Sequence, residues 1–144
     1  MTWCMYSAKN VAYILTSLEA IEKIKIYTQD ISDAEDLFDR DDQLIYNACL
    51  TLLMTLGEEI NKLNEELKEQ YSDMPWQSIK GMRNRIAHDY RGLDPTIPYN
   101  TIKQYLDPLK ECLVQMLDQV DYPDSKLNKI LESRYYKHLQ YLKK

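Results

Sequence analysis

One short segment of the 144-residue chain carries side chains that can do chemistry. Arg83 and His88 lie five residues apart, Asn84 directly follows the arginine, and Tyr90 comes two residues after the histidine. An arginine guanidinium is planar and permanently charged, and it matches the oxygens of a phosphate. A histidine can accept or donate a proton near neutral pH. These residue types favour a site that holds a phosphate and moves protons beside it.

The spacing of these side chains predicts how they lie on a helix that we expect at about residues 75–88. With about 100° per residue, the apolar side chains of this helix define the direction of the core. Arg83 and His88 then flank a sector that holds only Asn84 and the small Ala87. This arrangement predicts a shallow groove with a fixed cation on one side and an imidazole on the other.

Each of these side chains also has an interpretation without chemistry. A histidine near the C-terminus of a helix can simply interact with the helix dipole and the free carbonyls, as His88 would. Arg85 and Asp89 are four residues apart, which predicts a solvent-exposed ion pair. Tyr90 lies beyond the expected helix end, where its hydroxyl could remain free or could only pack against the following loop.

The order Arg83-x4-His88-x-Tyr90 resembles the Arg-x4–6-His signature of HEPN ribonucleases, and more closely the Arg-x4-His-x-Tyr motif of HepT-like toxins. Other segments follow in the same order as in that family. They are residues 56–63, similar to the family's Ile-Gly-Glu-Ala segment, residues 75–76 before the motif, and residues 92–94 after it. Glu59 departs from the pattern, because the family often has Ala there. The resemblance covers about residues 8–120.

The resemblance implies a homodimer whose two motifs meet in a cleft between subunits and cut an RNA substrate without metal. It also implies a partner, a minimal nucleotidyltransferase antitoxin, which transfers AMP from ATP to the motif tyrosine and silences the toxin. Arg83 and His88 would then be catalytic, Asn84 would support them, and Tyr90 would be the AMPylated residue. The alternative is a non-catalytic HEPN module that binds a nucleotide or only its nucleotidyltransferase partner.

Two histidines are present in the sequence, and this number bears on the same question. Transfer of a phosphate to a ribose 2′-OH needs one general base and one general acid. His138 is distant from the motif in sequence, and we interpret it as a residue without a catalytic role. Two copies of His88 across a two-fold axis would supply both roles.

Helical periodicity and few glycines predict an all-α, up-and-down helical bundle in one domain, residues 1–144. Its core would span about 8–120, with a C-terminal helical extension at about 124–142. Gly57 falls inside a helix, either to allow close approach of another helix or as a tolerated defect. Pro108 predicts a kink or a late start of the regular helix. We expect helices at about 8–28, 33–38, 42–69, 75–88, 99–119 and 124–142.

Composition points to a cytoplasmic protein without a cofactor. Hydrophobic residues make up 44% and charged residues 28%, an ordinary globular balance. No apolar run is long enough for a membrane span, and the N-terminus does not look like a signal peptide. Cys4, Cys49 and Cys112 are far apart, which argues against disulfides and a zinc site. Glu58 and Glu59 are adjacent and point to different helix faces, which argues against a carboxylate metal site.

Charge is distributed unevenly along the chain, whose net charge is −5. An acidic protein of this kind needs a local basic site to act on RNA. Residues 30–42 carry seven acids and one arginine, which predicts a solvated loop or a surface for a partner. Residues 124–144 are basic and rich in tyrosine. This tail could stack on RNA bases, or it could form an amphipathic helix that packs its tyrosines on the bundle.

Overall fold

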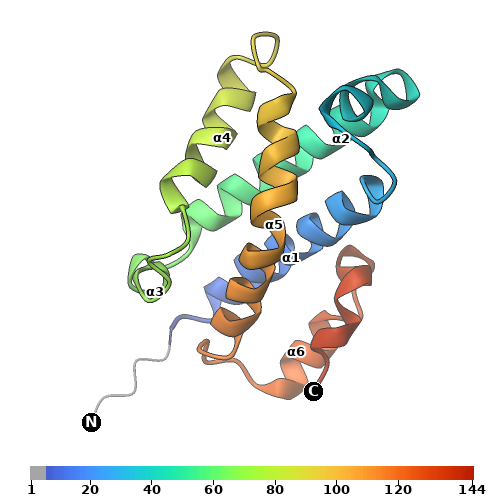
Figure 1. Cartoon of the computed structure of the whole chain (residues 1–144). Helices are drawn as coiled ribbons and strands as arrows, with labels where there is room; N and C mark the ends of the chain where they lie inside the picture. The colour runs from blue at the N-terminus through green and yellow to red at the C-terminus, as the bar shows by residue number, and fades with distance from the viewer. Residues whose placement is uncertain (1–5) are drawn as a thin grey trace.

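The computed structural model describes residues 6–144 and is all-α, as the periodicity predicts. Within this part of the chain the only extended pairing is a single bridge between Tyr6 and Val120. No helix among these residues combines the length and the apolar character that a membrane span requires. The elements in Figure 1 are α1 (Lys9–Tyr27), α2 (Ala34–Lys62), α3 (Glu65–Glu69), α4 (Trp76–His88), α5 (Thr96–Leu117), α6 (Asp124–Ile130) and the 3₁₀ helix η1 (Arg134–Leu142).

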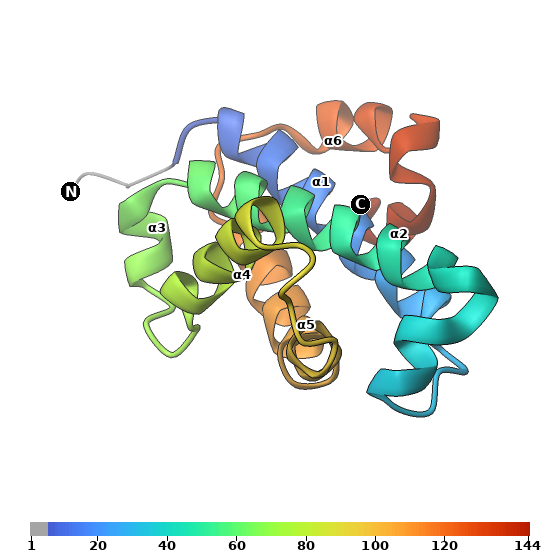
Figure 2. The ribbon, with the colours of Figure 1, turned by 90° about the horizontal axis from the view of Figure 1, so that it is seen from above.

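Helix α1 lies at the centre of the bundle. It packs against α2, α5 and η1, while α4 packs on α2. Figures 1 and 2 show α4 on one side of the molecule and the C-terminal segment on the other, beside α1. Apolar residues spaced three and four apart form the buried stripes of two helices. They are Val11, Ile14, Leu15, Leu18, Ile21 and Ile24 in α1, and Ile102, Leu106, Leu109, Leu113 and Met116 in α5.

Helix α2 is broken near its start and ends earlier than predicted. Residues 40–43 have non-helical backbone angles, and Asp41, Asp42 and Gln43 all have positive φ. The break separates a short first helical segment from the long one, as expected. The expected end at residue 69 is wrong, because Asn64 begins a new helix. Its side chain accepts hydrogen bonds from the backbone N–H groups of Glu66 and Leu67.

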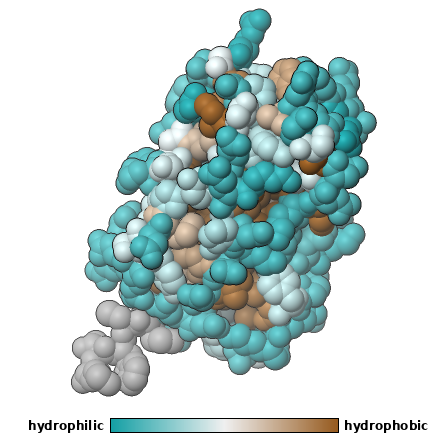
Figure 3. Space-filling view, viewed as in Figure 1, coloured by the Kyte–Doolittle hydropathy of each residue, from teal (hydrophilic) through white to brown (hydrophobic). Residues whose placement is uncertain are grey.

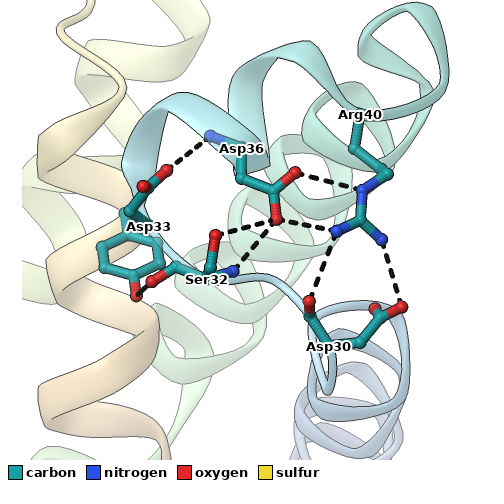
Figure 4. A network of polar contacts seen from close by, with 6 residues as sticks. Asp30, Ser32, Asp33, Asp36 and Arg40 are labelled. Atoms are coloured by element: carbon teal, nitrogen blue, oxygen red, sulfur yellow. Dashed lines mark hydrogen bonds and ion pairs between the residues drawn. The ribbon is translucent and has the colours of Figure 1, made fainter.

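The acidic run is folded rather than a solvated loop, because its residues 34–42 form the start of α2. Asp33 caps the helix by accepting a hydrogen bond from the N–H of Asp36. Arg40 binds Asp36 at 2.7 Å and Asp30 at 3.1 Å (Figure 4). The N–H of Ser32 donates to the Asp36 carboxylate, and this bond and the Arg40 guanidinium lower its pKa. One arginine thus neutralises part of the acidic run.

The C-terminal segment is not the continuous helix predicted over residues 124–142. Helix α6 ends at Ile130, and Ser133 then caps η1 by accepting a hydrogen bond from the N–H of Tyr135. Buried residues of η1 are leucines, Leu139 and Leu142, whereas Tyr135 remains 73% exposed. The prediction that the tyrosines of this segment face the bundle is therefore wrong for Tyr135.

A buried carboxylate ties this C-terminal segment to the centre of the bundle. Glu19 of α1 binds Nδ1 of His138 at 2.6 Å and accepts the backbone N–H of the same residue at 3.1 Å. The Glu19 side chain is only 5% exposed. A buried carboxylate is costly unless it is hydrogen-bonded, so this contact fixes the segment in place. His138 thus has a structural partner.

Candidate active site

Helix α4 presents the candidate site. It spans Trp76–His88, so the helix predicted over residues 75–88 is confirmed. Its buried side chains are Ile79, Met82 and Ile86, as the helical wheel predicts. The indole N–H of Trp76 bonds to the carbonyls of Lys68 and Tyr71 and fixes where the helix starts. Burial of the three apolar side chains turns the polar motif away from the core.

Gly57 marks a point of close approach between α2 and α4. A Cβ atom at this position would lie 2.6 Å from Cβ of Arg83 and 3.2 Å from its Cγ. Carbon atoms do not approach so closely without a shift, so the glycine is required by packing. The interpretation of Gly57 as a close-approach residue is confirmed. The stem of Arg83 lies directly over the backbone of α2.

The guanidinium of Arg83 is held from two sides. Nη2 of Arg83 lies 2.9 Å from Oε1 of Glu58 in α2, and Nε donates to the same oxygen at 3.3 Å. Nη1 donates to Oδ1 of Asn84 at 3.2 Å. About a third of the arginine side chain is exposed. The cation is therefore positioned before any substrate arrives, but a bound phosphate must compete with Glu58.

A hollow of about 300 Å³ lies beside this guanidinium, between α2 and α4. Ala87 and His88 do not line it, so the predicted groove is misplaced. The helical wheel considers one helix alone, whereas Gly57 brings α2 against the arginine side of α4. The lining residues are Gly57, Glu58, Asn61, Lys62, Lys80, Arg83 and Asn84.

His88 is the last residue of α4 and lies exposed on the surface. Within residues 6–144 its ring forms no hydrogen bond or ion pair. At the end of the helix, the carbonyl of Arg85 accepts a hydrogen bond from the backbone N–H of Asp89, not from the imidazole. The predicted ion pair between Arg85 and Asp89 is also absent from that part of the chain. The Asp89 carboxylate instead packs where a Cβ of Gly92 would lie. The imidazole is thus free to meet a substrate or a second chain.

Tyr90, which follows the end of α4, is held by a hydrogen bond to α2. Its hydroxyl donates a hydrogen bond to Oδ1 of Asn47 in α2, and the side chain is 45% exposed. It borders a hollow of about 440 Å³ that is separate from the one at Arg83. A reaction at the hydroxyl would first have to break the bond to Asn47. The residues around this hollow are Phe38, Gln43, Tyr46, Tyr90, Arg91, Leu93 and Pro95.

Comparison with known proteins decides the family. Residues 17–116 match the family described as Ribonuclease HepT-like, and this range holds the motif on α4 and the close approach at Gly57. The chain belongs to the HepT-like ribonuclease family. The "Probable ribonuclease HepT" of Thermococcus cleftensis is 29% identical over 98 residues, which cover 68% of this HepT-like chain and 86% of that relative.

A second relative of this HepT-like chain is longer. The "Gamma-glutamylcyclotransferase and putative RNase" of Methanocaldococcus jannaschii is 28% identical over 109 residues, which cover 76% of this chain and 48% of that protein. The HepT-like chain thus spans about half the length of this relative. No solved structure matches.

Two site residues of this HepT-like chain were missed by sequence reasoning. Glu58 contacts Arg83, and the sequence signal for this contact is the position of Glu58 directly after Gly57, where another helix comes close. Asn47 carried no signal, because its contact with Tyr90 joins residues far apart in the sequence. Both contacts depend on how α2 crosses α4.

Other reactive groups of the HepT-like fold are buried or scattered. Burial raises the pKa of the Cys49 and Cys112 thiols to about 12, so neither is a thiolate at neutral pH. Cys4 lies outside the described residues. Among residues 6–144, no group of three or more histidine, cysteine or acidic side chains could hold a metal ion.

Proposed function

We propose that this chain is a metal-independent endoribonuclease toxin of a HEPN/nucleotidyltransferase toxin–antitoxin pair. The single observation that carries the proposal is the arrangement on α4. Arg83 is hydrogen-bonded in place at a hollow, while the imidazole of His88 lies exposed at the end of the same helix. One residue is suited to binding a phosphate and the other to proton transfer.

The reaction would be an attack of a ribose 2′-OH on the adjacent phosphorus. A general base removes the proton of the 2′-OH, the new bond from O2′ to phosphorus forms, and the bond from phosphorus to O5′ breaks. A general acid protonates the departing O5′, which leaves a 2′,3′-cyclic phosphate and a 5′-OH end. Arg83 would stabilise the extra negative charge on the phosphate oxygens in the transition state.

One imidazole cannot be base and acid at the same moment, so the proposal includes a homodimer. A two-fold axis near the exposed end of α4 would bring a second His88 to the same phosphate. The exposure of His88 and its lack of partners within residues 6–144 support this arrangement.

The nuclease proposal is tested with purified protein and single-stranded RNA in EDTA. Cleavage should proceed and leave 2′,3′-cyclic phosphate ends. Arg83→Ala and His88→Ala should each lower the rate by about 10²-fold or more, because each removes a group that acts in the transition state. Arg85→Ala is the matched control and should keep the rate. RNA binding without cleavage by the wild type would favour the non-catalytic alternative.

Tyr90 would be the point of control. AMP attached to its hydroxyl would carry a phosphate and a base next to the motif. That phosphate would compete with the RNA phosphate for charge-assisted hydrogen bonds to the guanidinium of Arg83. Since the hydroxyl is bound to Asn47, the nucleotidyltransferase would have to draw Tyr90 away from α2.

Incubation with the cognate nucleotidyltransferase, ATP and magnesium should silence the nuclease and add AMP to Tyr90, as measured by mass spectrometry of peptides. Tyr90→Phe should cleave RNA yet escape silencing, because only the acceptor hydroxyl is lost. Tyr105→Phe, another exposed tyrosine, should be silenced as the wild type is. An adduct on another residue would refute this control mechanism and leave the nuclease assignment standing.

A further inference from the structure

The hollow beside Arg83 is one end of a longer groove between α2 and α4. A second hollow of about 440 Å³, distinct from the one at Tyr90, continues along α2 and α4 and is also lined by α3 and the segment that joins α3 to α4. The two hollows share Gly57, Asn61 and Lys80 as lining residues. The second one reaches Trp76 at the start of α4. The groove therefore follows α4 from Asn84 back to its first residue, away from His88.

Lys80 lies in the middle of this groove and stands apart from the other cations there. Lys62 is paired with Glu59, Lys68 with Glu65, and Arg83 with Glu58. Lys80 is exposed, and within residues 6–144 its ammonium forms no ion pair and no hydrogen bond. It is the groove cation that can bind an anion without first losing a partner.

The position of Lys80 suits the phosphate next to the one at Arg83. The two residues are three apart, which is about 4.5 Å along the axis of α4. The flexible four-carbon stem of a lysine lets its ammonium reach several ångströms further along the groove. A single strand whose phosphate sits at Arg83 would therefore bring its neighbouring phosphate within reach of Lys80.

Trp76 closes the far end of the groove one helical turn before Lys80. Its indole N–H is tied to the carbonyls of Lys68 and Tyr71, at 3.1 and 3.2 Å, so the ring cannot rotate freely. The side chain is half-buried and borders the second hollow. A fixed, partly exposed aromatic ring beside a cation is the usual arrangement for stacking a base of single-stranded nucleic acid.

We propose that the α2–α4 groove binds the RNA strand on one side of the cleaved bond, with Lys80 on the neighbouring phosphate and Trp76 stacked on its base. This assignment rests on the proposed function, which places the cleaved phosphate at Arg83. It explains how an acidic protein holds RNA through a local site. The groove would recognise the backbone and the face of a base, so the contact tolerates many sequences.

Binding of a 2′-O-methyl oligonucleotide tests Lys80 independently of cleavage, because such a strand has no free 2′-OH to react. Lys80→Ala should weaken binding about tenfold, and Lys80→Arg should restore most of it. The slope of log affinity against log salt should become shallower by about 0.7 for the lost phosphate contact. Lys126→Ala removes an exposed lysine of α6 and should change neither quantity. Equal affinities and slopes for Lys80→Ala and Lys126→Ala would overturn the phosphate contact.

Fluorescence tests the stacking. The chain has two tryptophans, Trp3 and Trp76, so Trp3→Phe leaves Trp76 as the single reporter. The 2′-O-methyl oligonucleotide should quench this emission, whereas an abasic strand of equal charge should bind without quenching it. An emission that is unchanged at saturating oligonucleotide would overturn the stacking role of Trp76. If cleavage fails but both binding results hold, the groove stands and the nuclease assignment falls.

Discussion

At the scale of single residues, the contact between Arg83 and Glu58 governs how easily a phosphate can reach the guanidinium. The guanidinium is already hydrogen-bonded to a carboxylate, and a phosphate must displace it. Glu58 is about half exposed, so water weakens the attraction and makes this exchange possible. The carboxylate holds Arg83 in position in the free protein and opposes the approach of a second anion.

Replacing this carboxylate by an amide separates the two effects. Glu58→Gln keeps an acceptor for Arg83 but removes the negative charge, so affinity for a 2′-O-methyl oligonucleotide should rise about threefold to tenfold at low salt. The gain should shrink as salt is added. Fluorescence anisotropy measures both quantities.

Glu111→Gln is the control for net charge, since Glu111 is exposed on α5. It should give a smaller gain than Glu58→Gln at every salt concentration. Equal gains in the two variants would mean that Glu58 acts only through the overall charge of the protein.

At the scale of elements, the crossing of α2 and α4 decides the geometry of the site. Glycine in a helix costs roughly 1 kcal/mol relative to alanine, yet Gly57 allows the stem of Arg83 to rest on α2. The face of the molecule seen in Figure 1 is largely hydrophilic, with separate apolar areas between polar ones (Figure 3). The site is built where two helices meet.

Two glycines of the site region should respond in opposite ways to alanine. At Gly57 the added Cβ meets Arg83 at 2.6 Å, so Gly57→Ala should lower the free energy of unfolding, by about 1–3 kcal/mol, and impair cleavage. At Gly81, in α4, the added Cβ would meet no side chain or other helix of residues 6–144 within 4 Å, apart from its immediate neighbours, so Gly81→Ala should raise stability by about 0.5–1 kcal/mol.

Thermal and urea unfolding of both variants measure these changes. A Gly57→Ala protein as stable and active as the wild type would show that α2 and α4 can separate without cost. The outcome for Gly81→Ala reports the gain in helix propensity alone and so calibrates the comparison.

At the scale of the whole molecule, the question is whether one chain is a complete enzyme. Arg83 faces the α2–α4 groove, whereas His88 lies outside it at the end of α4. The C-terminal segment covers the other side of the bundle, along α1, and leaves α4 uncovered (Figure 2). A second copy would find the motif helix accessible.

Mixing of subunits tests the proposed need for two His88 side chains. Light scattering at micromolar concentration should first show a dimer. Wild-type and His88→Ala chains are then mixed in equal amounts and exchanged to equilibrium. The mixture should have about a quarter of the activity of the same total amount of wild-type chains, because only dimers with two wild-type chains would be active. Activity of about half would mean that each chain works alone. Mixing with Arg85→Ala chains controls for exchange and should give full activity.

The sequence by itself determined the all-α class, the helices α1 and α4 to within about a residue, and the buried faces of α1 and α5. These features follow from contacts between residues three and four apart, which a single helix makes by itself. The motif that resembles the HepT-like family is local for the same reason. Gly57 also indicated, from the sequence alone, that another helix could approach the helix that contains it closely.

The tertiary structure alone decided which helix that is and what surrounds the motif. It placed Glu58 on Arg83, Asn47 on Tyr90 and Glu19 on His138, pairs that lie 25, 43 and 119 residues apart. It also divided the predicted helix at residues 124–142, because the segment bends to lie against α1. Such contacts depend on the angle and register at which helices cross, and these follow from the packing of all side chains together.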